Sequence, residues 1–114
     1  MDSRLLWGAL EMLILDVLAA GPSYGYAISQ TVLRRSDGYF DLKEGSLYPA
    51  LHRLERQKLL ETSWVDTAEG RRRKYYKLTP AGHNAHRQRR GEWNRFAAAV
   101  QSVLTGEEPA RALA

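Results

Sequence analysis

The stretch AEGRRRKYYKLTPAGH, residues 68–83, decides the fold. Residues 73–78 have the period of two and the aromatic content that predict a β-strand. Gly70 supplies the backbone angle that a tight hairpin loop requires. Thr79 and Pro80 predict the start of a helix, because threonine is a favoured N-cap and proline is favoured at the first helical position. The stretch therefore predicts one strand of a hairpin, followed at once by a helix.

The flanking residues complete the hairpin and the helix. LLETSWV, residues 59–65, predicts the first strand, and DTAEGRR, residues 66–72, predicts the loop. The last helix is predicted over residues 81–104. Residues 105–114 form a polar tail of small residues, which we expect to be disordered.

Three helices are predicted before the hairpin, over residues 3–20, 24–35 and 45–57. The first is apolar on two sides, so we expect one side to face its own domain and the other to face a second subunit. Ser23 is predicted to cap the second helix. The predicted fold is mostly α-helical, with one small β-hairpin.

The third predicted helix has an apolar stripe formed by Leu47, Leu51 and Leu54. Pro49 constrains where this helix begins, because proline is tolerated only in about the first helical turn. We therefore expect Ser46 or a neighbour to cap it.

Composition narrows the possible classes of protein. The chain has 114 residues, which favours one domain, and a formal net charge of +4, which weakly favours an anionic partner such as nucleic acid. It has no cysteine, which excludes disulfides and thiolate metal sites. No run reaches the roughly 18 apolar residues of a membrane span. Glu11 and Asp16 interrupt the apolar N-terminal segment, which favours a helix over a signal peptide. We expect a cytoplasmic protein.

The face of the third helix opposite its leucines is polar. It carries Pro49, His52, Arg53 and Arg56, with Ser46 and Tyr48 at its leading edge. A helix in the DNA major groove needs such groups near its N-terminal end. Arg53 would read guanine or hold a phosphate, and Ser46 and Tyr48 suit phosphate contacts. The alternative is an ordinary solvated helix face.

Four consecutive cations, Arg71, Arg72, Arg73 and Lys74, lie at the predicted end of the hairpin. A solvated run of charges is the simplest interpretation. The predicted fold, however, places this run beside the polar third helix. A basic hairpin in that position would grip the DNA backbone next to the major groove, or insert arginine into the minor groove.

Three blocks of sequence together resemble the PadR family of bacterial transcriptional regulators. They are SYGYAI (residues 23–28), GSLYPALHRLERQKLLETSW (residues 45–64) and GRRRKYYKLTPAGH (residues 70–83). The resemblance covers roughly residues 5–100 and is closest to the short subgroup of the family. It implies a winged helix-turn-helix domain over residues 1–79 and a single C-terminal dimerisation helix over residues 80–104.

The resemblance also implies roles for particular residues. The DNA contacts would be Tyr24, Ser46, Tyr48, His52, Arg53, Arg71, Arg72, Arg73 and Lys74. The homodimer interface would involve Leu5, Met12, Leu15, Trp93, Phe96 and Val100. Tyr75 and Tyr76 are expected to pack within the sheet.

Two interpretations of the apolar face of the last helix stay open. In the first interpretation, this face is only a dimer interface, similar to the edge of a coiled coil. Alternatively it lines a pore for planar aromatic compounds, as in short PadR members that stack such compounds on a tryptophan. Trp93 matches that tryptophan, and Gly8, Met12 and Phe96 would lie near it.

Other chemistry has little support. His83 and His86 have a spacing that can ligate metal, but the sequence offers no further ligand nearby, so we expect no metal and no cofactor. No arrangement of residues suggests an enzyme. We therefore expect a DNA-binding regulator, a repressor that binds a palindromic operator as a homodimer and is released by a planar aromatic inducer if it has one. The alternative is a small-molecule binding module with weak or secondary DNA binding.

Overall fold

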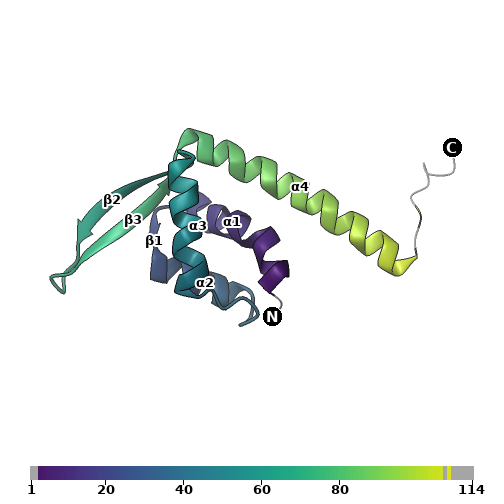
Figure 1. Ribbon diagram of the computed structural model, residues 1–114, viewed down its shortest axis with the longest axis horizontal. Coiled ribbons are helices and arrows are strands. Elements are labelled where there is room, and N and C mark those ends of the chain that lie inside the picture. The colour runs from purple at the N-terminus through teal and green to yellow at the C-terminus, as the bar shows by residue number, and fades with distance from the viewer. Residues whose placement is uncertain (1–2, 107, 109–114) are drawn as a thin grey trace.

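The computed structural model describes residues 3–106 and 108, with side chains described from residue 9 onward. Within these residues the elements follow the predicted order, with one additional short strand (Figure 1). They are α1 (Ser3–Ala19), β1 (Ser23–Tyr24), α2 (Gly25–Arg35), α3 (Glu44–Arg56), β2 (Leu60–Asp66), β3 (Arg72–Leu78) and α4 (Pro80–Thr105). The predicted helix and strand boundaries are confirmed to within two residues.

The core lies where α1, α2 and α3 meet one face of the sheet (Figure 1). The predicted stripe of α3 is confirmed, because Leu47, Leu51 and Leu54 are all buried. From the other two helices, Ile14 and Ile28 are fully buried. Burial of these aliphatic side chains is the main driving force for assembling the three helices.

The hairpin of β2 and β3, residues 60–78, is called the wing below. The two strands pair antiparallel from Leu60 with Leu78 to Asp66 with Arg72. Gly70 has φ 80° in the connecting loop, which confirms its predicted role in the turn. Tyr76 is buried in the core, as expected for a residue that packs within the sheet. The buried end of the wing is thus anchored, and its tip projects away from the core (Figure 1).

The sheet has a third strand that the sequence did not predict. Ser23 pairs with Tyr76 and Tyr24 pairs with Tyr75, which places β3 in the middle of the sheet. The prediction that Ser23 caps α2 is therefore wrong. Tyr24 occupies the N-cap position without a side-chain cap, because Ser23 belongs to the strand.

The start of α3 also differs from the prediction. Lys43 is the N-cap residue and makes no side-chain cap, so the expected cap by Ser46 or a neighbour is wrong. Pro49 lies inside the helix, beyond its first turn. Its missing N–H leaves one intrahelical hydrogen bond unmade near this end of α3.

The predicted start of α4 is confirmed. Thr79 is the N-cap, its Oγ1 accepts a hydrogen bond from Gly82 N at 3.0 Å, and Pro80 follows in the first turn. Thr79 Oγ1 also donates to the Lys58 carbonyl at 2.7 Å, and Thr79 N donates to the Leu59 carbonyl at 3.0 Å. The first turn of α4 is thereby fastened to the segment that follows α3.

Beyond this junction, α4 passes α1 and leaves the core (Figure 1). The radius of gyration is 16.9 Å, whereas a compact chain of this length has a value of about 13 Å. The far end of α4 therefore has little support from its own subunit. Of the predicted tail, Thr105 still belongs to α4, Gly106 caps it with φ 76°, and residues 107 and 109–114 lie outside the described residues.

We predict that Gly82→Ala destabilises the protein by about 1–3 kcal/mol, the typical cost of overpacking. An added Cβ at Gly82 would lie 2.1 Å from the Leu59 carbonyl oxygen, which is backbone and cannot swing away. Urea unfolding would measure the free energy change. The matched control is Gly91→Ala on the same helix, where the nearest atom is a flexible end of Arg95 at 3.6 Å. If Gly82→Ala is as stable as this control, the junction is not as tight as described.

Candidate nucleic-acid interface

A cleft of 710 Å³ lies between α3, the wing and the start of α2. It brings together six of the nine predicted DNA contacts, which are Tyr24, Tyr48, His52, Arg71, Arg73 and Lys74. These residues come from three separate segments of the chain. The other three predicted contacts, Ser46, Arg53 and Arg72, do not line it.

Gly25 shapes the floor of this cleft, and the sequence analysis did not single it out. It is the first residue of α2 and is buried against the side chain of Tyr48. An added Cβ would lie 2.5 Å from the Tyr48 hydroxyl oxygen. The absence of a side chain at Gly25 therefore allows the Tyr48 ring to lie across the start of α2.

The wing cations are interleaved with aromatic rings. The Arg73 guanidinium lies 4.3 Å from the centre of the Tyr24 ring, and Tyr24 packs edge-on against Tyr75 at 5.4 Å. The Arg72 guanidinium lies 5.3 Å from the centre of the Trp64 ring. Such cation–π contacts hold arginine side chains in defined positions while leaving their N–H donors available.

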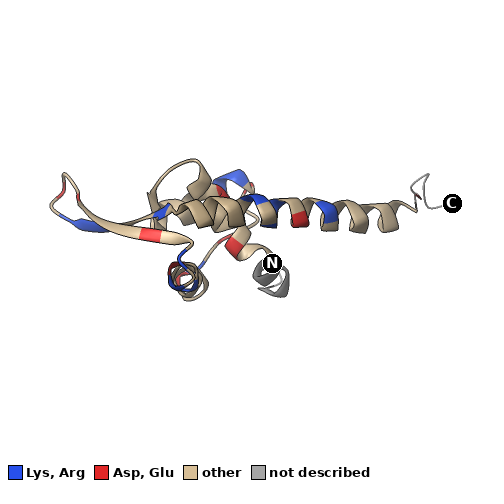
Figure 2. Cartoon of the chain, turned by 90° about the horizontal axis from the view of Figure 1, so that it is seen from above, with Lys and Arg blue, Asp and Glu red and all other residues tan. Residues whose placement is uncertain are grey.

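Carboxylates lie among these cations as well (Figure 2). Arg72 Nε is 3.6 Å from Asp66, so this arginine is held at the outer part of the wing. At the loop, backbone and Thr67 hydrogen bonds lower the pKa of the Glu69 carboxyl, so Glu69 adds a negative charge there. Of the four wing cations, Arg71, Arg73 and Lys74 line the cleft, whereas Arg72 lies beside Asp66.

Glu55 connects the wing to α3. Its carboxylate accepts hydrogen bonds from Lys74 Nζ and Thr62 Oγ1, both at 3.4 Å. Burial raises the pKa of the nearby Tyr76 phenol, and Glu55 adds to the shift, so Tyr76 stays neutral beneath the cleft. The sequence analysis missed Glu55, because its partners lie 7 and 19 residues away and leave no local pattern.

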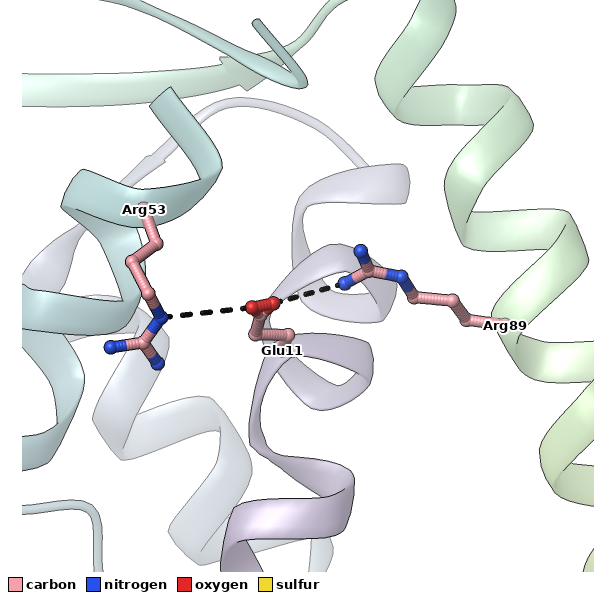
Figure 3. Close-up of polar contacts among 3 residues, drawn as sticks. All are labelled: Glu11, Arg53 and Arg89. Carbon is pink, nitrogen blue, oxygen red and sulfur yellow. Dashed lines mark hydrogen bonds and ion pairs between the residues drawn. The ribbon is translucent and has the colours of Figure 1, made fainter. Parts of the chain in front are cut away.

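Arg53 points away from the cleft, toward α1. Its Nε lies 3.8 Å from Glu11, and the same carboxylate accepts a hydrogen bond from Arg89 at 3.1 Å (Figure 3). His52, the preceding residue of α3, is exposed and lines the cleft instead. Arg53 is thus placed to join helices within the subunit.

The predicted ligand and interface residues fall into two groups. Trp93, Phe96 and Val100 are exposed on α4, and the Trp93 and Phe96 rings lie 5.7 Å apart. Val103 and Leu104 extend this apolar face with 80% and 75% of their surface exposed.

On α1, Met12 is half-buried, whereas Leu15 is 0% exposed in the core of the subunit. Leu15 therefore has no surface to offer a second subunit and is left out of the interface proposed below. The side chain of Leu5 and the surroundings of Gly8 lie outside the described part of the structure.

His86 makes a structural contact. Its Nε2 lies 2.8 Å from Asp16 Oδ1, and Asp16 also lies 3.6 Å from Arg90. His83 is exposed. Among the described residues, no group of three or more His, Cys, Asp or Glu side chains is arranged to hold a metal ion. Nor does any helix within those residues have the length and apolar character needed to cross a membrane.

A third helix with an exposed polar face and a basic hairpin beside it define a winged helix-turn-helix protein, an architecture of DNA-binding regulators. Residues 14–88 match the family model of the PadR-like transcriptional regulators. The chain belongs to this family, which confirms the resemblance seen in the sequence.

The chain is also similar to individual proteins. It is 31% identical over 106 residues to an uncharacterized protein X of Lysinibacillus sphaericus, covering 93% of this chain and 97% of that protein. It is 36% identical over 77 residues to a transcriptional regulator of Mycobacterium tuberculosis, covering 68% of each chain. The crystal structure of a PadR-like transcriptional regulator from Bacillus cereus superposes with a TM-score of 0.79 at 31% identity, covering 91% of this chain and 99% of that one.

We predict that Gly25→Ala lowers the affinity for duplex DNA about 3–10-fold, because the added methyl group displaces Tyr48 and removes about one polar contact. Anisotropy of a labelled duplex would measure the change. Gly91→Ala, which lies on α4, is the control and should bind as the wild type does. Equal affinity of the two variants would exclude Tyr48 from the interface.

Proposed function

We propose that this regulator is a homodimeric repressor that binds a palindromic operator, with α3 in the major groove and the wing against the neighbouring backbone. The observation that carries this proposal is the cleft, which gathers predicted contacts from β1, α3 and the wing on one side of the subunit. A single solvated helix face would not explain why residues so distant in sequence converge.

Each polar side chain in the cleft has chemistry that suits one kind of DNA contact. The His52 ring is exposed on α3 and can reach a base edge in the major groove. The hydroxyl groups of Tyr24 and Tyr48 can donate to phosphate oxygens. Arg71 and Arg73 supply fixed positive charge for the flanking phosphates, which favours salt-sensitive binding.

The far half of α4 supports the dimer. Residues 96–105 contain no charged side chain, and Phe96, Val100, Val103 and Leu104 are exposed along them. An apolar face of this kind is normally covered by another protein surface. Pairing of two α4 helices around a two-fold axis would present two wings and two α3 helices to a palindromic DNA site.

The Trp93 and Phe96 pair supports a second feature of the proposal, the planar aromatic inducer. The two rings lie 5.7 Å apart and remain partly exposed, so a flat compound can stack on them at the subunit boundary. Such a compound acts only if it binds one arrangement of the subunits more tightly than the other.

We predict that the double variant Arg71→Ala/Arg73→Ala weakens binding to every duplex and flattens its salt dependence. If the dimer neutralises about 6–10 phosphates, the wild-type slope of log K against log salt is about −5 to −9, and each lost phosphate contact reduces it by about 0.9. Anisotropy across a salt series measures both quantities.

Arg72→Ala is the control for this series, because Arg72 is paired with Asp66 and does not line the cleft. Arg72→Ala should change the slope of log K against log salt less than the double variant does. A double variant with the wild-type slope would remove the wing from the interface.

We also predict that a planar aromatic dye quenches tryptophan fluorescence and that Trp93→Phe removes most of this saturable quenching, because the dye stacks on Trp93. Trp64→Phe is the control, since Trp64 lies in the cleft on the wing. Quenching that survives Trp93→Phe but is lost in Trp64→Phe would place the dye in the cleft and contradict the inducer site.

A further inference from the structure

Glu11 joins three helices through one carboxylate (Figure 3). Its Oε2 accepts a hydrogen bond from Arg89 on α4 at 3.1 Å, and its Oε1 lies 3.8 Å from Arg53 Nε on α3. Glu11 itself belongs to α1, where the neighbouring Leu10 and Ile14 are buried in the core. The carboxylate is therefore fixed to the core while it holds one arginine from each of the other two helices.

This contact lies far along α4 from the junction at Thr79. Arg89 is ten residues from Thr79, which corresponds to about 15 Å along a helix. The junction holds one point of α4 against the end of α3. A helix held at one point can still tilt, and contacts further along α4, at His86, Arg89 and Arg90, limit that tilt.

A second carboxylate of α1, Asp16, also contacts α4 through His86 and Arg90. Among the described residues, Asp16 has no such pairing with α3. Glu11 differs because it reaches α3 as well, at the residue next to His52 of the cleft. It is thus placed to transmit the tilt of α4 to the helix that faces DNA.

We propose that Glu11 is a positioning residue that fixes the angle between α3 and α4 and thereby sets the half-site spacing that the dimer accepts. The second part rests on the proposed function, since it assumes that α4 carries the dimer contact. A small change in this angle moves the far end of α4 by several ångströms, because α4 spans about 39 Å. A tilt of about 5° displaces its far end by about 3.4 Å, which is the rise of one base pair.

The two contacts of Glu11 are weak, which indicates that they orient the helices more than they stabilise the fold. The Arg89 contact has the length of a hydrogen bond, whereas the Arg53 contact is longer than that limit and is mainly Coulombic. All three side chains keep between 24% and 33% of their surface exposed, so water and salt screen them. Loss of the Glu11 charge should therefore loosen the angle while leaving the melting temperature within about 3 °C of wild type.

Because the chain has no cysteine, two spin labels can be placed cleanly. Arg56→Cys on α3 and Gln101→Cys on α4 are exposed sites that report the distance between the helices. Labelled protein is mixed with excess unlabelled protein, so that distances within one subunit dominate. The measurement is pulsed electron paramagnetic resonance without DNA, on the wild type, Glu11→Gln, Arg89→Gln and a control.

The control is Glu61→Gln, which removes the same charge from an exposed position on β2. We expect Glu11→Gln and Arg89→Gln to broaden or shift the distance distribution by about 3 Å or more, and the combined variant to add nothing further. The control should match the wild type. A wild-type distribution in Glu11→Gln would overturn the positioning role.

A second experiment tests half-site spacing on duplexes selected from a random library by the wild-type protein. One base pair inserted between the half-sites should cost the wild type at least about tenfold in affinity, comparable to one mismatched contact. Glu11→Gln should reduce this discrimination several-fold, whereas Glu61→Gln should not.

The two experiments distinguish failure of the proposed function from failure of the inference about Glu11. If the wild type selects no DNA with two half-sites, the proposed function fails, and the distance measurement still decides whether Glu11 fixes the angle. If the angle loosens but the spacing discrimination is unchanged, the inference about half-site spacing is overturned.

Discussion

The hydrogen bonds of Thr79 with the segment after α3 are the constraint on which the rest of the structure depends. Thr79 Oγ1 donates to the Lys58 carbonyl and accepts from Gly82 N, while Thr79 N donates to the Leu59 carbonyl. Lys58 has φ 61°, a left-handed conformation that turns the chain from α3 into β2. At this one place α3 ends, the wing begins and returns, and α4 departs. The orientations of α3, the wing and α4 are therefore set together.

The polar side chains of the cleft are held in place by contacts within the subunit. The Arg73 guanidinium rests on Tyr24, and Lys74 is held by Glu55. Side chains ordered in advance lose less conformational entropy when a ligand binds. Gly25 belongs to the same arrangement, because its missing side chain makes room for Tyr48. The aromatic and acidic residues thus position the cations, and the cations supply the charge.

Local features of the chain were predictable because they depend on neighbours in sequence. Thr79 and Pro80 marked the start of α4, and the leucine stripe of α3 followed from its period. The sequence analysis missed β1, because two residues carry no period and their pairing depends on β3. It also gave no sign that Arg53, which it predicted to contact DNA, lies near Glu11, because this proximity arises only when α1 and α3 pack. The link from Glu11 to Arg89 spans 78 residues and has no local signal either.

The central claim is that the protein reads DNA as a two-fold dimer, with α3 in the major groove and the wing beside it. The most direct measurement is a hydroxyl-radical footprint of the wild-type protein on a duplex that it selects. The account predicts two symmetric protected regions on one face of the duplex, separated by about one helical turn or a multiple of it, each flanked by protection from the wing. A single protected region, or uniform protection without symmetry, would contradict it.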